Sequence, residues 1–297
     1  MNRGILLVLL TFAVIGYAFF HNEISAWADL ENEQQVVATE NNHVNLDARA
    51  AILLDSHTGE VLYTKNADTL YPVASMSKMM TEYLLLEAVK EQRTAWTDMI
   101  PISKNAATTE GARVNLVEGK AYPLKDLYEA MAVGSANNAA VAIGEYLAGS
   151  TSAFAEQMNL KAVELNLRSS QFVNATGLGY DYGQNEMSAR DVGILAYRLM
   201  NDFPDIIRVT SEPLIKLSST KETVQNTNVM LHADDETVRV DGIDGLKTGF
   251  TDDAGYCFTG TAQRGNKRLI SVVMGTKDEA ARFTDTKKLL EMGFDSE

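Results

Sequence analysis

Pro72-Val73-Ala74-Ser75-Met76-Ser77-Lys78-Met79-Met80-Thr81-Glu82-Tyr83-Leu84-Leu85-Leu86 is the stretch that decides how this chain is interpreted. Its apolar residues follow helical spacing, which predicts a helix to about Lys90 with Ser75 in the first turn. Residues three apart share a helix face, so a neutral Lys78 lies where it accepts the proton of the Ser75 hydroxyl. The spacing indicates a nucleophile and its base, although Ser218-Ser219-Thr220-Lys221 has the same spacing in a polar stretch without an apolar stripe.

The composition limits the classes of protein to which this chain can belong. With 297 residues, 45% of them hydrophobic and only 5 prolines, the chain is long enough for one large or two small domains. A net charge of -14 argues against nucleic-acid partners. The single cysteine, Cys257, excludes an intrachain disulfide and is expected to be a buried small hydrophobe. The four histidines lie at no metal-ligand spacing, so neither a metal nor an organic cofactor is expected.

The first 28 residues have the composition of a secretory signal peptide. An apolar run from Gly4 to Phe20 is followed by Ala26-Trp27-Ala28, a small-x-small cleavage pattern. A retained membrane anchor is the alternative, although the run is at the lower limit of length for a bilayer span. Residues 29–45 are polar and acidic and are expected to form a leader or tether. The protein is therefore expected to be exported, and to contact the membrane only if the N-terminal segment is retained.

Periodicity divides the remaining chain into three parts. Strands are expected first, as a hairpin of 48–54 and 60–63, and again at 238–243, 255–262 and 268–275. Between them lie a short strand at 99–102 and helices at 124–133, 138–147, 151–165 and 189–200, and a helix at 279–292 ends the chain. This order predicts one α+β domain over 46–297, with an antiparallel sheet built from both chain ends (about 46–74 and 238–297), flanked by helices. A helical subdomain of about 75–237 is inserted between them.

Two further motifs follow the Ser75 stretch in a fixed order. Ser135-Ala136-Asn137 interrupts two apolar helices, and Lys247-Thr248-Gly249 lies within the strand-like run 245–251. A second Ser-x-Asn, Ser103-Lys104-Asn105, lacks such a setting. Ser-x-x-Lys, Ser-x-Asn and Lys-Thr-Gly together are the signature of penicillin-binding proteins and related β-lactamases.

With these motifs the chain resembles the D-alanyl-D-alanine carboxypeptidases, the low-molecular-mass penicillin-binding proteins of the β-lactamase and transpeptidase fold. The resemblance spans about Leu46 to Phe294 and also rests on the segments 55–59, 172–178, 188–191 and 254–256. Many members carry a histidine just before the 188–191 segment, where this chain has Gln184-Asn185-Glu186-Met187. Many also continue into a small β-domain and an amphipathic membrane helix, whereas this chain ends at Glu297, which implies a catalytic domain without that tail.

The resemblance implies a serine-type carboxypeptidase that removes the terminal D-alanine of peptidoglycan stem pentapeptides through an acyl-enzyme. Ser75 is the expected nucleophile and Lys78 its base, which requires a low-dielectric, electropositive pocket to keep the lysine neutral. Ser135 is expected to relay a proton to the leaving amine. Asn137 is expected to hold either the peptide carbonyl or Lys78 itself.

The same resemblance implies a site for the substrate's carboxylate and an oxyanion hole. Lys247 supplies charge and Thr248 a hydroxyl for the terminal carboxylate, while Gly249 lets the substrate approach the strand. The backbone N–H groups of Ser75 and Phe250 form the expected oxyanion hole. Arg282 matches a family arginine near the cleft, although an exposed helix arginine explains it as well. β-Lactam antibiotics are the expected covalent inhibitors.

Three alternatives remain at the level of sequence. A DD-endopeptidase that cuts peptidoglycan crosslinks shares every residue named above. A class A β-lactamase needs a deacylating glutamate in a Glu-x-x-Leu-Asn loop, and Glu164-Leu165-Asn166 has the wrong spacing. A non-catalytic cell-wall scaffold tolerates loss of motif residues, but all of them are present here.

Overall fold

The structure, a computed structural model, describes residues 44–179, 183–232 and 235–296. The expected signal peptide 1–28 and nearly all of the expected leader 29–45 lie outside the described residues. In the described part of the chain, no helix combines the length and the apolar character that crossing a bilayer requires.

The core element is a five-stranded antiparallel sheet with strand order β10-β11-β12-β1-β2. The strands are β1 (Ala50–Asp55), β2 (Val61–Lys65), β10 (Ile243–Thr251), β11 (Gly255–Arg264) and β12 (Lys267–Thr276). β1 pairs with β12, and Ala50 lies opposite Met274, so the two ends of the described chain meet in the middle of the sheet. The expectation of a sheet built from both chain ends is confirmed.

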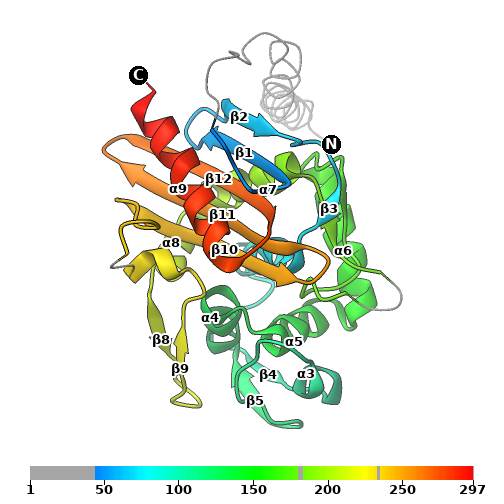
Figure 1. Cartoon of the computed structure of the whole chain (residues 1–297). Coiled ribbons are helices and arrows are strands. Elements are labelled where there is room, and N and C mark those ends of the chain that lie inside the picture. Colours follow the sequence, from blue (N-terminus) through cyan, green and yellow to red (C-terminus); the bar gives the residue numbers. More distant parts are fainter. Residues whose placement is uncertain (1–43, 180–182, 233–234, 297) are drawn as a thin grey trace, which may run out of the picture. The chain divides into compact units, whose positions relative to one another are not determined.

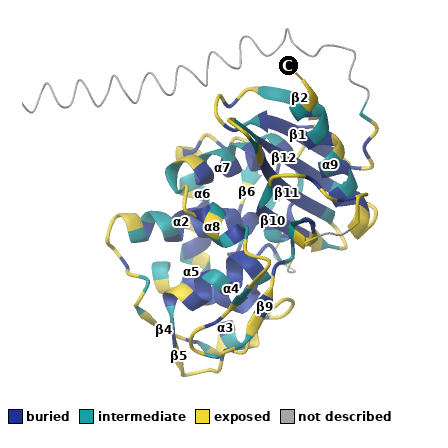
Figure 2. Cartoon of the chain, turned by 90° about the vertical axis from the view of Figure 1, so that its left-hand side faces the viewer, coloured by how far each residue is buried: buried dark blue, intermediate teal, exposed yellow. Residues whose placement is uncertain are grey.

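Each face of this sheet is covered by helices. Along β1, Ala50, Ile52 and Leu54 join the larger apolar cluster on the side of the helical part, whereas Ala51 and Leu53 join a second cluster on the opposite face, as strand alternation requires. The second cluster is completed by α9 (Glu279–Asp295), which lies across the sheet in Figure 1. Figure 2 shows α9 and α7 (Ala189–Asp202) on opposite sides of the strands. The sheet is therefore buried on both faces.

The helical part surrounds one central helix, α2 (Lys78–Lys90), which contacts four other helices. A short 3-10 turn, η1 (Ala74–Ser77), leads into it. The remaining helical elements are α3 (Lys104–Thr108), α4 (Leu124–Gly134), α5 (Asn137–Ala148), α6 (Thr151–Glu164), α8 (Ile206–Thr210) and the 3-10 turn η2 (Val229–His232). The long helices begin and end within a few residues of the expected positions, because their apolar stripes mark the faces that pack together.

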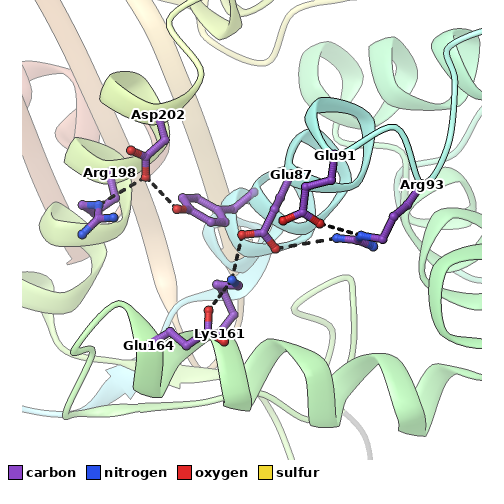
Figure 3. Close-up of polar contacts among 8 residues, drawn as sticks. Glu87, Glu91, Arg93, Lys161, Glu164, Arg198 and Asp202 are labelled. Atoms are coloured by element: carbon purple, nitrogen blue, oxygen red, sulfur yellow. Dashed lines mark hydrogen bonds and ion pairs between the residues drawn. The ribbon is translucent and has the colours of Figure 1, made fainter. Parts of the chain in front are cut away.

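Polar contacts on the outer side of α2 attach it to two of its neighbours (Figure 3). Lys161 of α6 lies 2.8 Å from Glu87 of α2, and the Tyr83 hydroxyl donates to Asp202 of α7 at 2.6 Å. The Lys161–Glu87 ion pair is partly exposed and contributes little on its own, whereas Tyr83 is buried. Together they fix the orientation of the helix that begins with Lys78.

The short strand expected at 99–102 is present as β4 (Met99–Pro101), whereas the other short strands were not expected and one expected strand is absent. The short strands are β3 (Tyr71–Pro72), β4 (Met99–Pro101), β5 (Ala121–Pro123), β6 (Ser170–Gln171), β7 (Glu186–Met187), β8 (Leu214–Lys216) and β9 (Thr223–Gln225). The prediction of a strand over 238–243 is wrong, because a turn around Asp235 takes the backbone N–H groups of Thr237, Val238 and Arg239. Gly242 then adopts φ +84 beside the Gln263 carbonyl, and β10 begins only at Ile243.

Candidate active site

Ser75 lies in the 3-10 turn η1, between β3 and α2. The preceding Ala74 adopts φ 46, a left-handed conformation that costs energy for a residue with a Cβ. Ser77 holds this geometry by donating from its hydroxyl to the Ala74 carbonyl at 2.9 Å. Ser75 itself is half-buried, so its hydroxyl remains accessible at the start of a helix whose next residues are fully enclosed.

Lys78 is completely buried, and its Nζ lies within hydrogen-bond distance of three oxygens. The distances are 2.8 Å to Ser75 Oγ, 2.7 Å to Asn137 Oδ1 and 2.7 Å to the Thr176 carbonyl. A lysine has three donors when protonated, so every one of them has a partner here. The serine and lysine of the opening motif are therefore in direct contact, one helical turn apart.

Burial lowers the pKa of Lys78 well below its usual value, and the nearby Lys247 lowers it further, while Glu82 opposes the shift. Burial also lowers the pKa of Lys247 to about 7. Glu82 again opposes this shift, and Arg282 adds to it. The site therefore has the low-dielectric, electropositive character that a lysine base requires.

The connection between α4 and α5 carries Ser135 and Asn137. Ser135 ends α4 at φ 60, in the left-handed region, and is buried. Asn137 begins α5, and its amide nitrogen donates to the Glu110 carbonyl at 2.8 Å, which turns its Oδ1 toward Lys78. Of the two contacts expected of Asn137, the one with Lys78 is present in this structure.

The third motif lies on β10, which is an edge strand of the sheet. Lys247 and Thr248 are buried, and the Thr248 hydroxyl lies 2.6 Å from that of Thr227. A Cβ on Gly249 would lie 2.8 Å from the Val73 carbonyl and 3.3 Å from the Ala74 Cβ. The absence of a side chain at Gly249 therefore lets β10 pack against the Ser75 turn.

Phe250 on this strand and Arg282 on α9 both contact Tyr256 of β11. Phe250 is 47% exposed and stacks on Tyr256 with ring centroids 4.2 Å apart. Arg282 is buried rather than exposed, pairs with Glu279 at 2.7 Å and donates to the Gly249 carbonyl at 3.4 Å. Arg282 thus supports the strand from the side of α9.

Both duplicate motifs have local structural roles. Ser103 caps α3 and donates to Glu145 at 2.6 Å. Ser218 and Ser219 donate to the carboxylate of Asp126 from the connection between β8 and β9. Neither serine approaches Lys78.

Two contributions to the site do not follow from motif spacing, and both come from segments outside the three motifs. Asn174 Oδ1 accepts from the backbone N–H groups of Thr176 and Gly177, which folds this loop so that the Thr176 carbonyl reaches Lys78. Asn185 fixes the loop by accepting from the Val173 N–H at 2.7 Å and donating to the Asn174 carbonyl at 2.8 Å. An Asn-x-Thr-Gly turn was the available signal, but its partner could not be read from the sequence.

The other missed residue is Glu82 of α2, which is 2% exposed. Sequence periodicity assigned it no role, although it follows Lys78 by one helical turn. Within the described residues, no group of three His, Cys, Asp or Glu side chains is arranged to hold a metal ion. The site instead offers the Ser75 hydroxyl next to the Lys78 amine, and the buried Lys247 followed on the same strand by the Thr248 hydroxyl. This arrangement suits activation of a serine and binding of an anionic group.

Comparisons with known proteins give concordant results. A family profile described as D-alanyl-D-alanine carboxypeptidase, peptidase S11, matches residues 34–278. D-alanyl-D-alanine carboxypeptidase DacF of Bacillus subtilis is 34% identical over 251 residues, which cover 84% of this chain and 62% of that protein. The chain thus spans less than two thirds of the length of this relative.

Two further relatives bear on the site. The structure of penicillin-binding protein D2 from Listeria monocytogenes with ampicillin bound matches with a TM-score of 0.74 and 37% identity, over 85% of this chain and 99% of that one. A D-alanyl-D-alanine endopeptidase of Escherichia coli is 28% identical over 259 residues, covering 85% of this chain and 79% of that protein. The fold expected from the motif order, that of penicillin-binding proteins, is confirmed.

Proposed function

The chain belongs to the peptidase S11 family of D-alanyl-D-alanine carboxypeptidases, and from this premise we propose that it hydrolyses the terminal D-alanine from peptidoglycan stem peptides. Ser75 is the nucleophile of this reaction and Lys78 its base. The reaction occurs outside the cytoplasm, where peptidoglycan is found, in keeping with the signal-like composition of residues 1–28.

The environment of Lys78 Nζ is the observation that carries this proposal. Two of its three partners, Asn137 Oδ1 and the Thr176 carbonyl, are oxygens that only accept hydrogen bonds. A neutral amine has two N–H donors and one lone pair. With both donors used by the carbonyls, the lone pair faces Ser75 Oγ, 2.8 Å away. The pocket thus orients a neutral lysine to receive the proton of the serine.

The chemical steps follow from this geometry. Ser75 Oγ bonds to the penultimate carbonyl carbon as its proton passes to Lys78, and the carbonyl oxygen becomes an oxyanion facing the N–H groups of Ser75 and Phe250. The C–N bond then breaks, and Ser135 relays a proton to the departing amine of D-alanine. Water subsequently attacks the ester, which releases the shortened peptide and restores the Ser75 hydroxyl.

The substrate's terminal carboxylate binds beside β10. Lys247 supplies positive charge and Thr248 a hydroxyl, while Arg282 supports the strand and adds to the positive field. Because β10 is an edge strand, one row of its backbone groups faces away from β11 and can pair with an extended peptide. β-Lactams present a carboxylate and a reactive carbonyl, so they acylate the same serine.

Penicillin acylation and D-alanine release test this function together. After penicillin treatment, intact-mass measurement should show one added drug mass on the wild type and none on Ser75→Ala. Only the wild type should release D-alanine from a stem pentapeptide. Ser218→Ala, at the start of the duplicate motif, is the matched control and should behave as the wild type. Acylation that is unaffected by Ser75→Ala contradicts the proposal.

A DD-endopeptidase is the second candidate. The aligned region covers 79% of the Escherichia coli endopeptidase, whereas it covers 62% of DacF. Crosslinked and free peptides distinguish the two activities. Release of D-alanine from the free pentapeptide identifies the carboxypeptidase, whereas cleavage of a crosslinked peptide dimer alone identifies the endopeptidase.

A further inference from the structure

Glu82 is a buried carboxylate for which the proposed reaction has no use. It follows Lys78 by four residues on α2, so the two side chains share one face of the helix. Only 2% of its surface is exposed, and its Oε1 has no hydrogen-bond partner among the described residues. A buried carboxylate without such partners is costly unless opposite charge compensates it.

Two buried lysines provide that compensation. Lys78 is on the same helix and Lys247 reaches in from β10, and each lowers the pKa of Glu82 against the larger effect of burial, which raises it to about 7. Burial raises the pKa of the Tyr128 phenol on α4, and the negative charge of Glu82 raises it further. Glu87, Glu91, Arg93 and Lys161 form ion pairs with one another on the outer side of α2 (Figure 3).

We propose that Glu82 is a positioning residue that supplies a buried counter-charge for Lys78 and Lys247 and thereby sets the pH range over which the two lysines lose their protons. This inference rests on the proposed function for its catalytic consequence. Acylation needs Lys78 neutral and Lys247 charged, so with Glu82 ionised the cluster of two lysines and one glutamate holds one of the three protons that it can bind. One negative charge beside two amines stabilises that distribution. It compensates the positive charge of one ammonium group, and the positive charge of a second ammonium group would have no counter-charge.

The pH profile of penicillin acylation is the first test. Glu82→Gln keeps the shape of the side chain and removes the charge that favours protonation of both lysines. We therefore expect the acidic limb, set by Lys78, and the alkaline limb, set by Lys247, both to move toward lower pH by about one unit. A purely structural role lowers the rate at every pH without moving either limb.

Glu87→Gln is the matched control, since Glu87 lies on the same helix but pairs with Lys161 and Arg93 on its outer side. Both limbs should stay in place in this variant. If Glu82→Gln fails to fold, Glu82→Met replaces the carboxylate with an apolar chain of similar length and should shift the limbs in the same direction.

Direct titration of the lysines separates this inference from the proposed function. The 13Cε signals of Lys78 and Lys247 in lysine-labelled protein should titrate at lower pH in Glu82→Gln than in the wild type. If the lysine titrations shift in Glu82→Gln, the role of Glu82 as counter-charge is supported. If penicillin acylation does not follow these titrations, the lysine-base mechanism fails, but the role of Glu82 stands. Identical lysine titrations in the two proteins overturn the role of Glu82, whatever the activity.

Discussion

Lys78 illustrates what spacing reveals at the scale of single residues and what it does not. Its proximity to Ser75 follows from helical periodicity over three residues, so the sequence was sufficient to predict it. Its contact with the Thr176 carbonyl joins residues 98 positions apart. Every residue has a backbone oxygen, so the sequence does not indicate which one contacts Lys78. Glu82 was missed for a related reason, because a glutamate in an apolar helix has no evident partner until the sheet brings Lys247 beside it.

The charge state of this site predicts a bell-shaped pH dependence for penicillin acylation. The rate should rise about tenfold per pH unit as Lys78 loses its proton, and it should do so well below pH 10, because the pKa of Lys78 is strongly lowered by burial. The rate should then fall above about pH 7, where Lys247 in turn loses the charge that holds the carboxylate. Rapid-mixing measurements with a fluorescent penicillin give the profile. A rate that shows no ionisation below about pH 9 would contradict the lysine-base mechanism.

At the scale of elements, length determines what could be predicted. The patterns of the long elements are strong because α4, α5, α6, α7 and α9 each bury a continuous stripe, and because β11 and β12 are each buried over six consecutive residues in a sheet with two covered faces. Strands of two or three residues, such as β3 and β7, contain too few residues to show a period. They form because tertiary contacts between longer elements hold them side by side, and the local sequence does not reveal these contacts.

The end of α4 makes a prediction about Ser135 that separates stability from activity. Its left-handed φ of 60 is unfavourable for a serine and favourable for glycine. Ser135→Gly should therefore raise the free energy of unfolding by about 1 kcal/mol and lower D-alanine release about 100-fold through loss of the proton relay. Thermal denaturation and a D-alanine assay measure the two effects.

Gln92→Gly provides the comparison, since Gln92 has φ 59 beyond the end of α2 and takes no part in the site. It should gain similar stability and keep full activity. A fully active Ser135→Gly would show that this serine serves only as a helix cap.

At the scale of the whole molecule, the site depends on a sheet that only the complete domain can form. Ser75 and Lys78 follow the first hairpin, whereas Lys247 belongs to β10 near the other end. α9 packs on the outer face of the sheet and presents Arg282 to the same strand. The general arrangement was predictable, since strands at both ends must pair, but the strand order and the packing of Gly249 against Val73 required the structure.

The α9 interface predicts a large loss of stability far from the reacting groups. Leu289 is fully buried against the sheet, so Leu289→Ala should lower the free energy of unfolding by about 2–5 kcal/mol. Leu160→Ala on α6, where the side chain is 66% exposed, should change it by less than about 0.5 kcal/mol. Urea denaturation with both variants checks the difference. Equal effects would mean that α9 contributes little to the domain.

The pairing of Ala50 with Met274 also determines when, during synthesis, this protein becomes reactive. A nascent chain that ends before β10 already contains Ser75 and Lys78, but it has neither Lys247 nor the strands that separate β1 from solvent. Without them the lysine stays hydrated, protonated and unable to act as a base. A translation product that ends before β10 is therefore expected to be chemically silent, and the nucleophile is expected to be activated only once β10, β11 and β12 have joined the sheet.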